Sequence, residues 1–184
     1  PLPQLTDFNR SLFGELRNLY LNFGADQANR IKETERTTNN DVKAVEYFLR
    51  EEFDRLGIGH YKEFIHFGLT SQDINNTAMP MMLRDALNDV VVPSLTRIGN
   101  QLRQRQTDWK SIPMLARTHG QPASPTTLGK EFGVFAERLE TQLSTLRYLP
   151  HMGKFGGATG NFNAHHVAYP TVDWIAFANV FVND

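Results

Sequence analysis

The segment from Met114 to Glu131, MLARTHGQPASPTTLGKE, combines side chains that bind anions or move protons with residues that shape the backbone. Arg117 and Gln121 can donate hydrogen bonds to a carboxylate or phosphate, and histidine is the side chain that titrates closest to neutral pH. A single histidine in a loop is more often structural than catalytic. Here, however, His119 stands among such donors in a segment stiffened by prolines, so it is a candidate proton donor at a site for an anionic ligand.

Two more polar segments interrupt the helical pattern, each where a helix is expected to begin. They are TTNNDVKA (37–44) and HFGLTSQDINNT (66–77), and their candidate residues are Asn39, Asn40, Asp41, Thr70 and Ser71. Asn, Asp, Ser and Thr are favoured helix caps, and capping alone would explain them. A helix start also exposes free amides and a partial positive charge, which bind carboxylates or phosphates. The residues alone leave both roles open.

Composition excludes several classes of protein. The chain has 184 residues and a net charge of −1, which gives no reason to expect nucleic acid or an anionic membrane as a partner. It has no cysteine, which excludes disulfides and thiolate metal sites and favours a cytoplasmic location. No metal is expected, because the adjacent His165 and His166 cannot face one ligand position and no His-Glu-x-x-His spacing occurs. The glycine-rich segment 153–166 lacks the Gly-Lys-Ser/Thr ending of a phosphate-binding loop.

Apolar residues recur at three- and four-residue steps along most of the chain, which predicts long helices. The runs cover residues 7–37 with a break near Gly24, 41–56 before Gly57, 70–106, and 125–149. No strand alternation is sustained. We therefore predict an all-α architecture, a bundle of long helices that associates with other subunits.

Local signals predict where these helices begin and bend. Thr70-x-x-Asp73 fits a capping box, and Ser124 followed by Pro125 predicts the start of the last helix. Pro80 and Pro93 are expected to kink or split the helix that contains them.

Four segments carry the polar motifs and their surroundings: TTNNDVKAVEYFL, FIHFGLTSQDINNT, RTHGQPASPTTLGKE and GGATGNFNAH. In this order they resemble the adenylosuccinate lyase family of the fumarase/aspartase superfamily, and the resemblance extends from about Ile31 to Trp174. It implies a long-helix bundle that is part of a larger homotetramer with shared active sites. Residues 1–60 would end an N-terminal helical domain, and residues 61–184 would form the first part of the central bundle.

The resemblance implies a β-elimination without a cofactor. The family releases fumarate from adenylosuccinate, leaving AMP, and from SAICAR, leaving AICAR, in purine biosynthesis. A base removes the proton next to a carboxylate, an acid protonates the leaving nitrogen, and preorganised hydrogen bonds stabilise the carbanion. Matched residue by residue, His119 is the general acid. The substrate-binding residues implied by the same match are Asn39, Asn40, Asp41, Thr70, Ser71, Thr118 and Gln121.

The chain departs from the family pattern in two places. The family has histidine in the middle of the first motif where this chain has Asn40, which can donate a hydrogen bond but cannot carry charge. The Ser-Ser-x-Met-Pro-x-Lys-x-Asn loop that supplies the base in the family is absent from the sequence. Because the chain also begins without Met and stops within a helix-like run, we expect a fragment that holds the general acid and does not turn over alone.

Three alternatives are open at this point. The chain could belong to another fumarate-releasing lyase, such as argininosuccinate lyase, which a substrate panel would separate. It could be a non-catalytic, lyase-like helical protein, a role that Asn40 permits but that gives no reason to keep His119, Thr70 and Ser71. It could also be a bundle whose polar loops only cap helices, which four motifs in the family's order argue against.

Overall fold

A computed structural model describes residues 2–183; Pro1 and Asp184, the outer limits of the two expected domains, lie outside the described residues. The chain forms two compact units. Unit 1 contains the residues up to Asn76 and those from Lys154 onward, and unit 2 contains Thr77–Gly153. The domain boundary expected near residue 60 stays a prediction.

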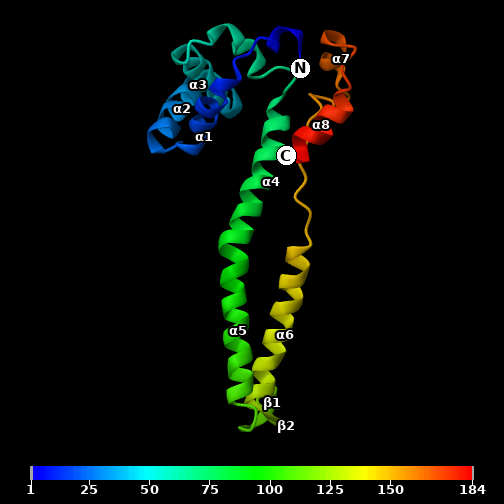
Figure 1. Cartoon of the computed structure of the whole chain (residues 1–184). Coiled ribbons are helices and arrows are strands. Elements are labelled where there is room, and N and C mark those ends of the chain that lie inside the picture. The colour runs from blue at the N-terminus through cyan, green and yellow to red at the C-terminus, as the bar shows by residue number, and fades with distance from the viewer. Residues whose placement is uncertain (1, 184) are drawn as a thin grey trace. The chain divides into compact units, whose positions relative to one another are not determined.

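Short helices joined by tight turns make up the first part of unit 1. They are the 3-10 helices Pro3–Leu5 and Arg10–Leu12, α1 (Phe13–Leu21), α2 (Ala25–Thr38), α3 (Asp41–Arg55) and the 3-10 helix Gly59–Phe64. Gly24 precedes α2, and Gly57, with φ of 73°, follows α3, so the predicted break and stop are confirmed. α2 packs against α3, which buries Val42 and Phe48 (Figure 1).

The second part of unit 1 contributes α7 (Asn163–Ala168) and α8 (Trp174–Asn183). Its interior is aromatic: the rings of Phe155 and Trp174 lie edge-on to the imidazole of His165, at centroid distances of 5.3 and 4.9 Å. Phe67, from the segment before α4, joins the same cluster. Residues far apart in the sequence thus share one core.

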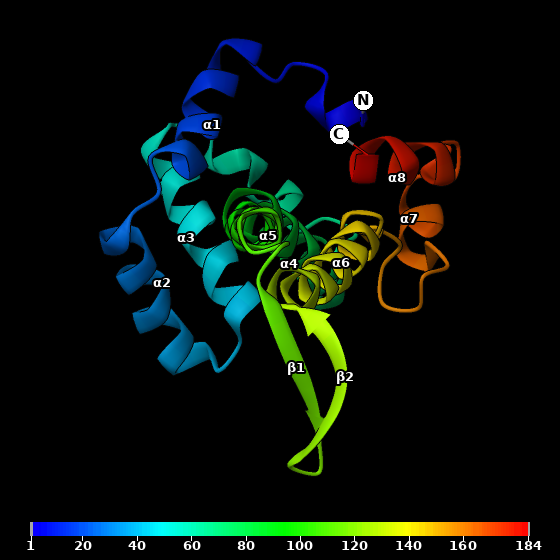
Figure 2. The same ribbon diagram turned by 90° about the horizontal axis from the view of Figure 1, so that it is seen from below.

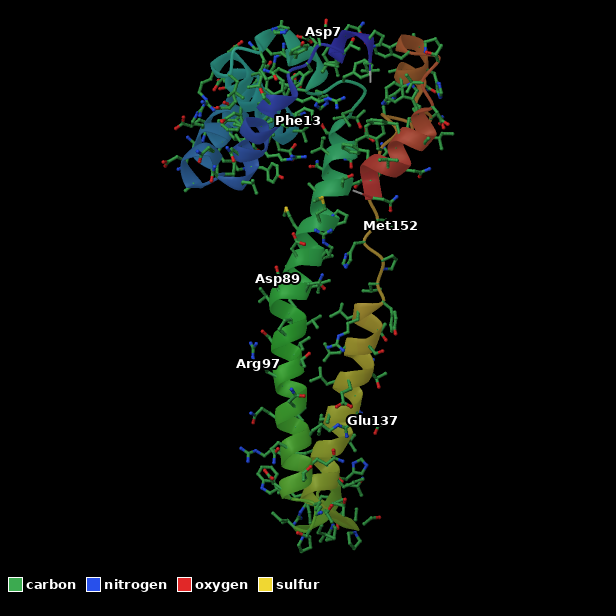
Figure 3. The ribbon with its side chains drawn as sticks, in the orientation of Figure 1. Asp7, Phe13, Asp89, Arg97, Glu137 and Met152 are labelled. Carbon is green, nitrogen blue, oxygen red and sulfur yellow. The ribbon has the colours of Figure 1, made fainter. Side chains whose placement is uncertain are left out.

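One long helical run crosses from unit 1 into unit 2. It consists of α4 (Ser71–Ala86), a π-helical turn (Leu87–Val91) and α5 (Val92–Asp108), and Figure 3 labels Asp89 and Arg97 along it. Pro80 lies inside α4 without splitting it. The π turn ends two residues before Pro93 and contains Asp89, four residues before that proline. In a regular helix the proline ring would clash with the Asp89 carbonyl.

In unit 2, α6 (Leu128–Arg147) runs alongside α5 (Figures 1 and 2). Two glycines of α6 lie close to α5. A Cβ on Gly129 would lie 2.4 Å from the backbone carbonyl oxygen of Gln106, and one on Gly133 would lie 2.6 Å from the side-chain amide nitrogen of Gln106. Arg103 on α5 also pairs with Glu140 on α6.

Between α5 and α6 the chain forms a β-hairpin that the sequence pattern did not predict. β1 (Pro113–Thr118) pairs antiparallel with β2 (Gln121–Thr127), and the register is irregular between Leu115 and Arg117. The predicted helix start at Ser124 and Pro125 was wrong, because both residues lie in β2. Thr127 caps α6 instead, its hydroxyl accepting a 3.3 Å hydrogen bond from the Lys130 amide.

Candidate functional site

His119 and Gly120 form the two-residue turn at the tip of the hairpin, which Figure 2 shows extending from α5 and α6. Their φ angles are 50° and 76°, the left-handed pair that such hairpins require. The predicted neighbours Thr118 and Gln121 stand opposite each other at the base of the turn. The Arg117 guanidinium donates to the Gly120 carbonyl oxygen across 3.2 Å, which holds the turn closed.

The backbone at His119 is unusual for its residue type. Left-handed φ is uncommon outside glycine, and unfavourable backbone geometry concentrates at functional sites. The side chains of His119, Thr118 and Gln121 are exposed, and within residues 2–183 His119 makes no hydrogen bond or ion pair. The turn therefore presents an imidazole to whatever approaches the hairpin tip.

At the start of α3, the first predicted motif acts as a set of caps. Asn39, with φ of 51°, ends α2. The Asn40 side-chain oxygen accepts from the Lys43 amide at 2.8 Å, and the Asp41 carboxylate accepts from the Val42 amide at 2.8 Å. All three residues are exposed. The predicted capping of the following helix is confirmed for Asn40 alone, because Asn39 ends α2 and Asp41 is the first residue of α3. The substrate-binding role of all three stays a prediction.

At the start of α4, Thr70 and Ser71 are half-buried. The Thr70 amide donates to the Asp73 carboxylate at 2.8 Å, and the Thr70 hydroxyl donates to the same oxygen at 3.3 Å. This is the Asp73 half of the predicted capping box.

Asp73 has a larger role than the sequence indicated. It is 3% exposed, and its carboxylate also accepts from the amides of Gly156 and Gly157, at 3.0 and 3.1 Å, and pairs with Lys154 at 2.7 Å. Burial raises the pKa of this carboxyl, but the bonds from Lys154, Thr70 and Gly156 outweigh it and hold the pKa below its ordinary value.

Glu46 of α3 links two of the predicted segments. It is 7% exposed and pairs with Lys43 at 2.5 Å, with Arg50 at 3.3 Å, and with His66 from the second motif at 3.7 Å. Burial raises its pKa, but the hydrogen bond and charge of Lys43, together with the neighbouring His66 and Arg50, outweigh burial and hold the pKa below its ordinary value. The buried Glu46 thus connects Lys43 of segment 37–44 with His66 of segment 66–77 in unit 1. His119, Thr118 and Gln121 belong to unit 2.

Unit 1 also contains an apolar cavity. The cavity of about 490 Å³ in unit 1 is lined by apolar residues: Leu2, Leu5, Phe64, Ile65, Phe67, Leu69, Phe155, Val172, Trp174, Phe177 and Phe181. Across residues 2–183, no three His, Cys, Asp or Glu side chains gather as metal ligands. No helix in the same range has the length and apolar character to cross a membrane.

The chain also matches known proteins over most of its length. A family described as "Lyase" matches residues 4–182, nearly the whole chain. The chain belongs to this lyase family. Among its relatives, proteins named adenylosuccinate lyase are 55% identical over 172 residues in Dictyostelium discoideum, 48% over 164 in Vibrio cholerae and 43% over 182 in Escherichia coli K12. These matches cover 91%, 89% and 98% of this lyase chain, but it spans only 37%, 36% and 40% of the relatives' lengths.

Solved structures with other activities share the fold. The 3-carboxy-cis,cis-muconate lactonizing enzyme of Pseudomonas putida matches 74% of this lyase chain and 31% of its own, with a TM-score of 0.64 and 28% identity. The β-carboxy-cis,cis-muconate cycloisomerase of Acinetobacter calcoaceticus matches 88% and 38%, with a TM-score of 0.64 and 21% identity. The predicted helical fold of the fumarase/aspartase type is confirmed. The hairpin, which the sequence pattern did not predict, is the one sheet within the described residues.

Proposed function

We propose that this chain carries the general-acid part of an adenylosuccinate lyase, which releases fumarate from adenylosuccinate and from SAICAR. One observation carries the proposal: the three relatives described above, all named adenylosuccinate lyase, are 43–55% identical over 89–98% of the chain. Fold alone would not support it, because the similar solved structures have other names.

In the proposed reaction, a base takes the proton from the carbon next to a succinyl carboxylate. The electron pair left on that carbon forms the double bond of fumarate as the neighbouring carbon–nitrogen bond breaks. The purine nitrogen, or the amide nitrogen of SAICAR, leaves with that bond's electrons and takes a proton from His119. The hairpin geometry supports this role, because a donor must reach the leaving nitrogen, and the imidazole is exposed and hydrogen-bonded to none of residues 2–183.

The proposal gives the remaining predicted residues binding roles. Thr70 and Ser71 hold the succinyl carboxylate at the start of α4, where free helix amides favour an anion. Thr118 and Gln121 orient the substrate beside His119, and residues 39–41 contact it from the start of α3. In the structure, the Asn40 oxygen is already used by the Lys43 amide, which leaves its amide group to donate.

The proposed site is completed by groups that this sequence does not contain. No Ser-Ser-x-Met-Pro-x-Lys-x-Asn segment occurs among its 184 residues, so the base comes from elsewhere. We place the enzyme in the cytoplasm, as a homotetramer whose subunits share each site. On this account the purified 184-residue chain releases no fumarate, and steady release from it would refute that part.

A substrate panel tests the proposal. The product of the complete open reading frame is assayed for fumarate with adenylosuccinate, SAICAR and argininosuccinate. Release from the first two alone supports the proposal. Release from argininosuccinate would assign the chain to another lyase, and release from none would favour a non-catalytic relative, with Asn40→His as the variant that tests whether Asn40 is disabling.

A further inference from the structure

We infer that Asp73 is a positioning residue for Thr70 and Ser71, and that Lys154 neutralises its charge so that the pair can accept a substrate carboxylate. This inference rests on the proposed function of that pair. The observations behind the inference are the contacts of the Asp73 carboxylate, which is buried although a helix cap could be exposed to solvent.

The Asp73 carboxylate joins two stretches of chain. From one side it accepts the amide and hydroxyl of Thr70, at 2.8 and 3.3 Å. From the other it accepts the amides of Gly156 and Gly157, at 3.0 and 3.1 Å, and the Lys154 ammonium at 2.7 Å. A carboxylate offers about four lone-pair sites, so these donors occupy it fully.

Capping alone does not explain this arrangement. A cap needs a single bond to a free amide at the helix start, and an exposed side chain supplies it, as Asn40 does for α3. Asp73 is instead 3% exposed, and burying a carboxylate is unfavourable unless it is paired and bonded. The additional contacts fix the residue before Ser71 to residues 154–157.

Packing holds both sides of this connection in place. His165 is 1% exposed and lies between the two stretches. A Cβ on Gly68 would come within 2.4 Å of the His165 Nε2 atom, and one on Gly157 within 3.4 Å of its Cε1 atom. The His165 ring therefore lies against both Gly68, two residues before Thr70, and Gly157.

Charge explains the presence of Lys154. An unpaired carboxylate two residues from Ser71 would repel the succinyl carboxylate of the substrate. The Lys154 ammonium is 2.7 Å from Asp73, and it also donates to the Gly157 carbonyl oxygen, which keeps it against the loop. The pair is therefore neutral, and the helix start keeps its attraction for an anion.

The test compares inhibition by the two products in the complete enzyme. Asp73→Asn keeps the side-chain shape but replaces one accepting oxygen with a donor. We expect inhibition by fumarate to weaken about tenfold and kcat/KM to fall roughly 10- to 100-fold, since a misplacement of about 1 Å can cost that much in rate. Inhibition by AMP should not change, because AMP lacks the succinyl carboxylates.

Two further variants complete the experiment. Asp85→Asn changes an exposed aspartate of α4 that pairs with Arg84, and it should alter neither inhibition constant. Lys154→Gln keeps the backbone bonds to Asp73 and exposes the substrate to its charge, so it should also weaken fumarate inhibition selectively. If Asp73→Asn does not fold, fumarate inhibition of Lys154→Gln tests the inference in its place.

Unchanged fumarate inhibition in a folded variant would overturn the inference, and so would equal weakening of fumarate and AMP inhibition. These results differ from failure of the proposed function, in which the unmodified enzyme would release no fumarate from adenylosuccinate.

Discussion

The start of α4 and the tip of the β1–β2 hairpin carry the two halves of the proposed chemistry, and they are built in opposite ways. At the start of α4, Thr70 is connected through the buried Asp73 to a loop distant in sequence. At the hairpin tip, His119 is exposed and held by its own turn alone. Groups that bind a carboxylate gain from rigid surroundings, whereas a proton donor must reach its substrate.

The two regions also differ in their effect on the stability of the fold. The α4 start stabilises the fold, because its polar groups are bonded to one another. The turn places a histidine at φ of 50°, where asparagine or glycine would be less strained. A residue kept in an unfavourable conformation is typical of a functional position.

The largest expected effect is at His119. His119→Asn suits the left-handed turn and keeps a hydrogen-bond donor, but it cannot supply a proton. In the complete enzyme kcat should fall roughly 10²- to 10⁴-fold with KM little changed. Thermal unfolding should show the variant at least as stable as the original. A change confined to KM would make His119 a binding residue.

A pair of glycine substitutions compares the two regions directly. Gly68→Ala places a Cβ 2.4 Å from His165 Nε2 at φ of 67°, so it should lower the free energy of unfolding by about 2–5 kcal/mol, from overpacking and left-handed strain together. Gly120→Ala, at φ of 76° with no atom within 4 Å, should lose only roughly 1–2 kcal/mol. Denaturant unfolding of both variants measures the difference, and equal losses would show that the α4 start is not tightly packed.

A smaller effect is expected at Asn40. Asn40→His removes the bond from the Lys43 amide and should lower the free energy of unfolding by about 1 kcal/mol. Because the resemblance implies a histidine at this position, kcat/KM should be at least as high as before. Asn40→Ser is the matched control: it keeps the cap and adds no imidazole. A variant Asn40→His with unchanged stability would argue that the cap contributes little.

The smallest effect is a pH dependence of stability. Burial lowers the pKa of His165, with the charge of His166 adding to the decrease and Asp73 opposing it. Below the ordinary histidine value of about 6.5, the unfolded chain binds a proton that the folded chain does not, so stability falls as the pH drops. His165→Leu should reduce this loss in thermal unfolding between pH 7.5 and 5, whereas the exposed His151→Gln should leave it unchanged. An identical pH profile in both variants would contradict this account.

Much of the helical structure could be predicted from local patterns. Val42 and Phe48 marked the buried face of α3, and Asn40 marked its start. The hairpin could not be predicted in this way, because its strands carry Pro122 and Pro125 and are largely exposed, so no alternation appears. The two-residue His119–Gly120 turn was the available signal.

The candidate site likewise has a part that local sequence predicts and a part that it does not. Its residues could be proposed from short motifs, since each cap and turn depends on neighbours in sequence. The role of Asp73 could not, because the Gly156 amide that it binds lies 83 residues away and only the folded chain brings them together. Lys154 belongs to none of the motifs, and its proposed role follows only from its ion pair with Asp73.

The account depends most on His119 as the proton donor, and the pH dependence of kcat tests it most directly. The complete enzyme and its His119→Asn variant are compared in fumarate release from saturating adenylosuccinate. A general acid must be protonated, so kcat of the unmodified enzyme should decline at alkaline pH, and this decline should be absent from the variant. An alkaline decline that persists unchanged in the variant would contradict the account, because another group would then supply the proton.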